Sequence, residues 1–153
     1  MKTYKNIIAV LFIGFITVSL FGFAEKAKAI PPSSYSISVT SGPTVVGRDA
    51  SMSGIASATN YVGQYSQYGI AINWGDGTPV TNYPNLSALG FTNGGGNFSG
   101  SWPTSLHTYA YPGSYSAQVK LYKGNVNSVA KASANVQIDI ICTPQFPPFE
   151  APC

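Results

Sequence analysis

Apolar and polar residues alternate in several separate stretches of this 153-residue chain. In residues 34–40 a tyrosine, an isoleucine and a valine alternate with serines and a threonine. The same period of two recurs in residues 50–56, 68–74, 114–122 and 128–141. Such alternation is typical of β-strands with one buried face, because successive side chains of a strand point to opposite faces. We therefore expect a strand in each of these ranges.

Glycine, proline and asparagine separate the alternating stretches. Ser41-Gly42-Pro43 is expected to interrupt the first strand, and Gly75-Asp76-Gly77 to end the strand before it in a tight turn. Residues 79–106 are the least regular part of the chain, so we expect no long strand or helix there. At most, short pairings around 87–92 and 97–102 would form a hairpin with the three consecutive glycines as its turn.

Six or seven short strands with turns between them predict an all-β fold, an antiparallel β-sandwich. Charged residues are scarce and serine, threonine and asparagine are abundant, so hydroxyl and amide groups should cover most of the outward faces. We find no internal repeat.

The N-terminal segment has the features of a secretory signal peptide. Lys2 and Lys5 precede an uncharged apolar run over residues 7–24, and Ala27-Lys28-Ala29 follows as a small-x-small cleavage site. We expect residues 1–29 to form a signal-peptide helix that is removed before Ile30. An uncleaved N-terminal membrane anchor is the alternative, because the apolar run approaches the length of a spanning helix. Either case predicts a secreted or cell-surface protein.

Removal of residues 1–29 changes the charge of the chain. Four basic residues (Arg48, Lys120, Lys123 and Lys131) then face four acidic ones (Asp49, Asp76, Asp139 and Glu150), so the formal net charge is zero. A neutral chain has no excess of basic residues for a phosphate backbone, which argues against nucleic acid as a partner.

The C-terminal residues 142–153 form a proline-rich tail that contains both cysteines. Cys142 and Cys153 are candidates for a disulfide in an oxidising compartment. No second cysteine pair or nearby histidine accompanies them, so they do not resemble a metal site. The expected organisation is thus a signal peptide or membrane anchor over residues 1–29, a β-sandwich over residues 30–141 and the proline-rich tail over residues 142–153.

Two motifs carry a resemblance to a known family. Trp74-Gly75-Asp76-Gly77-Thr78 is followed by His107-Thr108-Tyr109 and then by Pro112-Gly113-Ser114-Tyr115. In this order the motifs resemble the PKD (polycystic kidney disease) domain, an immunoglobulin-like sandwich of about seven strands. The resemblance covers about residues 33–141. Two departures are that Ile72 stands where the family usually has its core tryptophan, and that residues 79–106 form a long insertion.

The motif residues have structural roles in this interpretation. Asp76 is expected to cap its turn through nearby backbone amides, and His107 to bond to backbone near the Pro-Gly corner. Tyr115 is expected to bury its ring and to send its hydroxyl back to upstream backbone. The resemblance implies a non-catalytic module for protein–protein or protein–carbohydrate contact, without a cofactor.

Catalysis and ion binding have little support in the sequence. His107 is the only histidine, so a hydrolytic triad would have to combine it with Asp76 and with Ser101 or Ser105. Asp76 and Asp49 could supply oxygens to calcium, but such sites normally gather more carboxylates than this chain offers. We therefore expect no enzyme and no bound metal, with a small secreted hydrolase as a remote alternative.

Aromatic residues are the candidates for ligand contact. They lie in the loop before the third strand and in the insertion, and they are Tyr61, Tyr65, Tyr83, Phe91, Phe98 and Trp102. Exposed rings stack on sugars or fill pockets of a protein partner. The alternative is that they pack under their own loops as a small satellite core. A surface protein or a glycan is the expected partner. Alternatively, the chain is a structural subunit that exchanges its extended residues 30–33 or its proline-rich tail with a neighbour.

Overall fold

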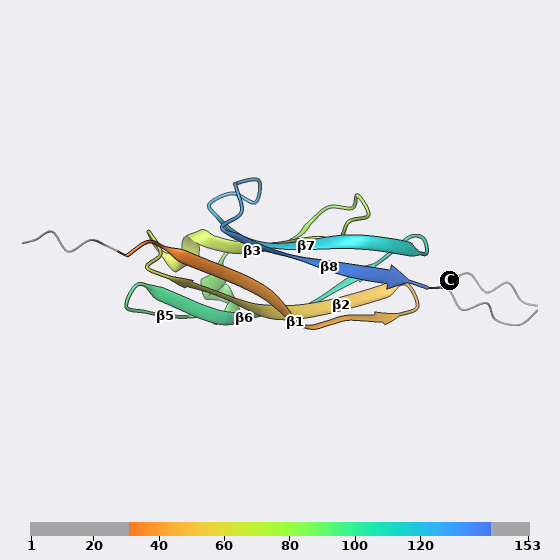
Figure 1. Ribbon diagram of the computed structural model, residues 1–153, viewed down its shortest axis with the longest axis horizontal. Coiled ribbons are helices and arrows are strands. Elements are labelled where there is room, and N and C mark those ends of the chain that lie inside the picture. The colour runs from red at the N-terminus through yellow and green to blue at the C-terminus, as the bar shows by residue number, and fades with distance from the viewer. Residues whose placement is uncertain (1–30, 142–153) are drawn as a thin grey trace, which may run out of the picture. The chain divides into compact units, whose positions relative to one another are not determined.

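The computed structural model describes residues 31–141 and shows a β-sandwich of two antiparallel four-stranded sheets (Figure 1). One sheet has the strand order β1-β2-β6-β5 and the other has the order β4-β3-β7-β8. The strands are β1 (Ser34–Val46), β2 (Asp49–Thr59), β3 (Tyr68–Asn73), β4 (Thr81–Tyr83), β5 (Thr92–Gly94), β6 (Asn97–Thr108), β7 (Gly113–Lys123) and β8 (Ala132–Ile140). Two short 3-10 helices, η1 (Tyr65–Gln67) and η2 (Leu86–Leu89), lie in the connections.

Several predictions fall on residues outside this range. The signal peptide over 1–29, the tail over 142–153 and the pairing of Cys142 with Cys153 lie outside the described residues. Among the residues that the structure does describe, no helix is long and apolar enough to cross a bilayer.

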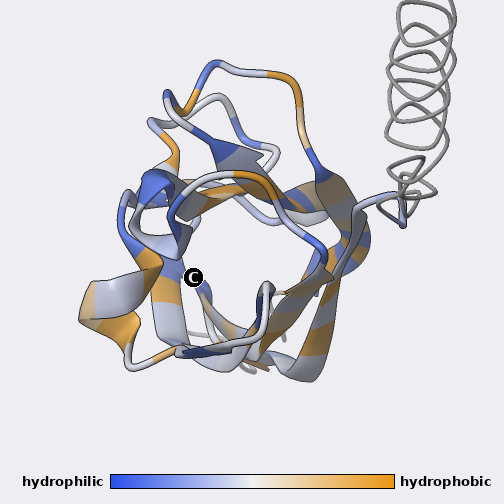
Figure 2. Cartoon of the chain, turned by 90° about the vertical axis from the view of Figure 1, so that its left-hand side faces the viewer, coloured by the Kyte–Doolittle hydropathy of each residue, from blue (hydrophilic) through white to orange (hydrophobic). Residues whose placement is uncertain are grey.

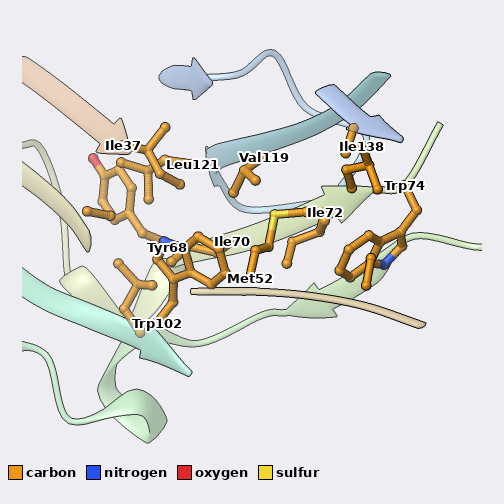
Figure 3. Close-up of a cluster of buried hydrophobic side chains, with 14 of the residues drawn as sticks. Ile37, Met52, Tyr68, Ile70, Ile72, Trp74, Trp102, Val119, Leu121 and Ile138 are labelled. Atoms are coloured by element: carbon orange, nitrogen blue, oxygen red, sulfur yellow. The ribbon is translucent and has the colours of Figure 1, made fainter. Parts of the chain in front are cut away.

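The core lies between the two sheets and is built from the inward positions of the alternating strands. Figure 2 shows apolar and polar residues alternating along the strands, and Figure 3 shows the apolar side chains meeting between the layers. The inward residues of β2, β3 and β7 are those expected from the sequence, with Met52, Ile72 and Val119 at most 1% exposed. Burial of such side chains stabilises the fold by roughly 1.5–3 kcal/mol each relative to full exposure.

The prediction that residues 79–106 contain no long strand was wrong. β6 begins at Asn97, runs through this segment and pairs with β2. Met52 pairs with Ser105 and Gly54 with Trp102, so Pro103 and an adjoining residue face a single residue of β2 in a β-bulge. Inward positions of β6 are even-numbered before the bulge and odd-numbered after it. The alternation of apolar and polar residues therefore shifts by one position within the strand, and no single period of two runs through residues 97–108. Proline is tolerated there because the bulge leaves it outside the hydrogen-bond ladder.

Other boundaries also differ from the expectation. The last strand begins at Ala132, so Ala130 belongs to the preceding loop. Residues 86–89 form η2 where a short strand was expected. The glycine-rich hairpin is confirmed, because Gly94 pairs with Asn97 and the two glycines between them make the turn with positive φ angles. β1 continues through its expected break with two register shifts.

Candidate functional site

The structure brings the two sequence motifs together in a cluster that we call the motif corner: Trp74, Asp76, His107, Tyr109 and Tyr115. The His107 imidazole stacks on the Trp74 indole with 4.9 Å between ring centroids, and Tyr109 meets His107 edge-on at 4.7 Å. The Tyr109 hydroxyl donates a 2.9 Å hydrogen bond to the backbone carbonyl of Trp74. The corner therefore ties the end of β3 to the end of β6.

Asp76 caps its own turn and also holds the histidine. Its Oδ1 accepts hydrogen bonds from the Thr78 amide at 3.1 Å and the Thr78 hydroxyl at 2.6 Å, as expected for a capping aspartate. Its Oδ2 lies 2.7 Å from His107 Nε2. The expectation that His107 would bond to backbone was wrong, because the turn brings a carboxylate within its reach. Burial opposes ionisation of Asp76, but the bonds from Thr78 and His107 outweigh it, so its pKa lies below the ordinary 3.8.

Asp76→Asn is expected to lower the free energy of unfolding by about 1–2 kcal/mol at pH 7, because an amide is a weaker acceptor than a carboxylate. The pKa of Asp76 is depressed by folding, so its stabilising contribution is present at neutral pH and is lost as the pH falls through the folded-state value. Urea denaturation should therefore show a difference between wild type and variant that shrinks below pH ~4. A difference of constant size down to pH ~2 would contradict this role.

Tyr115 completes the corner after the Pro112-Gly113 bend. Its ring stacks on Tyr109 with 4.2 Å between centroids, and its hydroxyl donates a 2.8 Å hydrogen bond to the carbonyl of Tyr111. A tyrosine that bonds back to upstream backbone is the arrangement expected at this bend. Burial raises the pKa of Tyr109 to about 12, with smaller contributions from the nearby Asp76 carboxylate and the Tyr115 phenol. The Tyr109 phenol therefore keeps its proton, and its hydrogen bond to the Trp74 carbonyl, to a higher pH than an ordinary tyrosine would.

Neither serine that the sequence offered to a hydrolytic triad is hydrogen-bonded to the histidine. Ser105 is buried, and its hydroxyl lies 2.8 Å from the Tyr83 hydroxyl. Ser101 is exposed on the outward side of β6, whereas His107 lies on the inward side. Within residues 31–141, no three His, Cys, Asp or Glu side chains gather as metal ligands. The Asp49 carboxylate instead accepts a hydrogen bond from the Thr108 hydroxyl.

Three of the six aromatic residues proposed for ligand contact lie in the core. Phe91, Phe98 and Trp102 are 5%, 2% and 1% exposed. Phe98 and Trp102 occupy inward positions of β6, and Phe91 packs edge-on against Phe98 with 6.2 Å between centroids. Surface exposure of these rings was therefore a wrong expectation. They also form no satellite core under their own loops, because they belong to the main core between the two sheets.

The other three aromatic candidates, Tyr61, Tyr65 and Tyr83, are partly buried against the core. The Tyr61 ring lies edge-on to Phe98 at 5.0 Å, and its hydroxyl donates a 2.7 Å hydrogen bond to Asn93 Oδ1. Tyr61 and Tyr65 pack the segment before β3 against the core, whereas Tyr83 belongs to strand β4 and its hydroxyl lies 2.8 Å from the Ser105 hydroxyl. None of the six candidates presents a fully exposed ring, so they do not form an aromatic platform.

The outward side of the β1-β2-β6-β5 sheet has a different character, which sequence reasoning anticipated only as a general covering of hydroxyls. We call it the hydroxyl face. Its hydroxyl-bearing residues include Ser34, Ser36, Ser38, Thr44, Ser51, Ser53, Ser57, Thr59, Thr92, Ser99, Ser101 and Thr108. The four strands contain no lysine or arginine and a single carboxylate, Asp49 at one end. Val46, Ile55 and Leu106 are exposed on the same face.

A shallow depression of about 440 Å³ lies on the hydroxyl face where the β5–β6 hairpin meets β2. The side chains that line it from the outward positions are Ser57, Thr59, Thr92, Asn97 and Ser99. None of these five residues was among the residues predicted to contact a ligand. The sequence feature that could have indicated this surface is the recurrence of serine and threonine at every second position in strands that pair with one another.

Comparison with known proteins identified no family. No protein-family model matches the chain, and a search of curated proteins found no match. The fold itself is established as a sandwich of two antiparallel four-stranded sheets.

Proposed function

We propose that the chain is an exported, non-catalytic module of the PKD type that binds a protein or a glycan at the cell surface or outside the cell. Strand order supports this assignment: when the eight strands are lettered A, B, C, C′, D, E, F and G along the chain, the sheets become ABED and C′CFG. These are immunoglobulin-like orders. The order of the motifs from Trp74 to Tyr115 and the export-type sequence of residues 1–29 support the rest.

The observation that carries the proposal is the composition of the hydroxyl face. Val46, Ile55 and Leu106 are 73%, 48% and 66% exposed on it, and the four strands carry only one charged side chain, at one end. Depletion of charge around exposed apolar groups is typical of a contact surface. The motif corner supports a non-catalytic role, because the hydrogen bond and ring contacts of His107 link strand ends.

A charge placed on the hydroxyl face tests the proposal. Ser101→Lys introduces a cation opposite Ile55, its pairing partner on β2. Labelled chain should bind about tenfold more weakly to the surface of the cells that export it, because the lysine must be desolvated at the contact. Ser133→Lys is the matched control, since Ser133 is an exposed strand residue of the other sheet. Unchanged binding by both variants, with unchanged melting temperatures, would overturn the assignment of this face.

A structural subunit that assembles by strand exchange is the second candidate, and the open edge of β6 favours it. β5 pairs only with residues 97–99 of β6, so the rest of β6 has no β5 partner. Pro103 lies in that open stretch and lacks a backbone N–H, so a strand from a neighbouring copy could pair with only part of this edge.

Light scattering over a concentration series separates the structural subunit from the binding module. Growth of assemblies without ligand would favour the subunit, and a constant monomer mass would favour the binding module.

A further inference from the structure

We propose that the depression at the β5–β6 hairpin is a binding site for a neutral glycan. The inference rests on the proposed function and deepens it, because it names a ligand class and a position on the hydroxyl face. It is carried by the cross-strand register of the lining residues, their lack of charge, and the way in which the hairpin is held.

The lining presents a row of hydroxyl groups that spans three strands. Ser99 of β6 pairs with Ser57 of β2 on one side and with Thr92 of β5 on the other. Adjacent strands lie about 4.8 Å apart, so the three hydroxyls follow one another at intervals that a sugar ring can bridge. Serine and threonine hydroxyls both donate and accept hydrogen bonds, as the hydroxyls of a sugar do.

No charged side chain lines the depression. An anionic ligand, such as a phosphate, a sulfate or a uronic acid, would lose hydration without gaining a lysine or arginine partner. A cationic ligand would equally lack a carboxylate. The lining therefore matches an uncharged polyhydroxyl ligand better than an ionic one.

Asn97 adds an oriented amide. Its Oδ1 accepts a 3.2 Å hydrogen bond from the Asn60 backbone N–H, which leaves the two N–H groups of the amide nitrogen to donate to a ligand. The Thr92 hydroxyl donates to the Ser99 carbonyl at 3.0 Å, so its oxygen lone pairs remain to accept. The depression thus offers donors and acceptors at fixed positions.

The hairpin wall is held in place before a ligand arrives. The Tyr61 backbone N–H donates to the Gly96 carbonyl at 3.1 Å, and its hydroxyl donates to Asn93 Oδ1. Beneath the hairpin, Phe91 packs against Phe98. A wall that is already ordered costs little conformational entropy on binding. Tyr61 is a positioning residue in this arrangement, because it acts through the hairpin.

The expected affinity is modest. Hydrogen bonds supply the contacts, since Phe98 is the only aromatic residue in the lining and its side chain is buried. Without ring stacking, a short oligosaccharide should bind with a Kd in the millimolar range, about 1 mM or weaker. Repetition along a polysaccharide or a cell surface would raise the effective affinity.

The test is a titration of the ¹⁵N-labelled chain, purified as exported, followed by amide chemical shifts. The probes are tetrasaccharides of cellulose, mannan, starch and chitin, each added to about 10 mM, with a hyaluronan tetrasaccharide as the charged comparison. At least one neutral probe should shift amides of residues 57–59 and 92–99 and leave β7 and β8 unchanged. Ser57→Ala and Asn97→Ala should each weaken that probe about fivefold. Ser38→Ala removes a hydroxyl from the same face outside the depression and should have no effect.

Three results would overturn the glycan site: no shifts with any neutral probe, shifts centred elsewhere, or tighter binding of the charged probe. If Ser101→Lys still weakens cell-surface binding in that case, the glycan site fails while the binding module stands. If a neutral probe shifts the expected amides but Ser101→Lys leaves cell-surface binding intact, the site stands and the wider contact surface fails. A melting temperature for each variant excludes unfolding as the cause.

Discussion

Trp102→Ala is expected to lower the free energy of unfolding by about 3–5 kcal/mol, the range seen when a large aromatic side chain is removed from a core. Trp102 is 1% exposed, and its indole lies directly over Gly54 of β2. No larger residue could stand at that glycine without displacing the ring. Because a domain of this size has a total stability of about 5–15 kcal/mol, urea denaturation should show a much lower midpoint or a largely unfolded variant.

Trp102→Phe is the matched variant for this prediction. The indole Nε1 has no hydrogen-bond partner among the described residues, so phenylalanine loses part of the packing and no protein hydrogen bond. It should fold and lie between the wild type and the alanine variant in stability. The interpretation of Trp102 as a ligand-contacting residue makes the opposite prediction, in which binding is lost and stability is nearly unchanged. That outcome would contradict the buried position.

The strands that keep one phase of alternation could be read from the sequence. In β7, Ala117, Val119 and Leu121 follow each other at every second position, and all three are buried. The sheet face that is buried is fixed by this period, because a shift of one residue would turn every apolar side chain outward. The fold class therefore followed from local pattern alone.

β6 could not be read in the same way, because its pattern changes phase within the strand. Trp102 and Ser105 both point inward although three positions separate them, and the intervening bulge contains Pro103. The period of two is broken by a feature that exists only through pairing with β2. The same strand supplies Phe98 and Trp102 to the core, so missing β6 also led to the wrong prediction for these two aromatic residues.

The candidate site was missed for a related reason. The row formed by Ser57, Ser99 and Thr92 is a product of register between strands, and the residues are distant in sequence. Each serine or threonine alone is an ordinary outward residue of a strand. The link between Asp76 and His107 is similar, because it joins a turn to a distant strand. Sequence pattern predicts which side of a strand is polar, and pairing determines which polar groups become neighbours.

Gly75→Ala is expected to lower the free energy of unfolding by about 2–5 kcal/mol, more than the same change at Gly77. Both glycines have φ +82°, a left-handed conformation that costs an L-residue roughly 1–2 kcal/mol. At Gly75 an added Cβ would also lie 2.5 Å from the backbone carbonyl oxygen of Ser116, so β7 would have to move at a further cost of about 1–3 kcal/mol. At Gly77 the space within 4 Å is open.

The comparison of the two alanine variants isolates the contact, because their backbone conformations match. Gly77→Ala should lose about 1–2 kcal/mol, and the difference between the variants should fall in the range of the added steric cost. Urea denaturation at neutral pH measures both, and unchanged amide shifts of β7 in Gly77→Ala would confirm that its effect is local. Equal losses of unfolding free energy in the two variants would mean that the Ser116 backbone can shift at no measurable cost. The close approach of this turn to β7 would then contribute nothing to the stability of the motif corner.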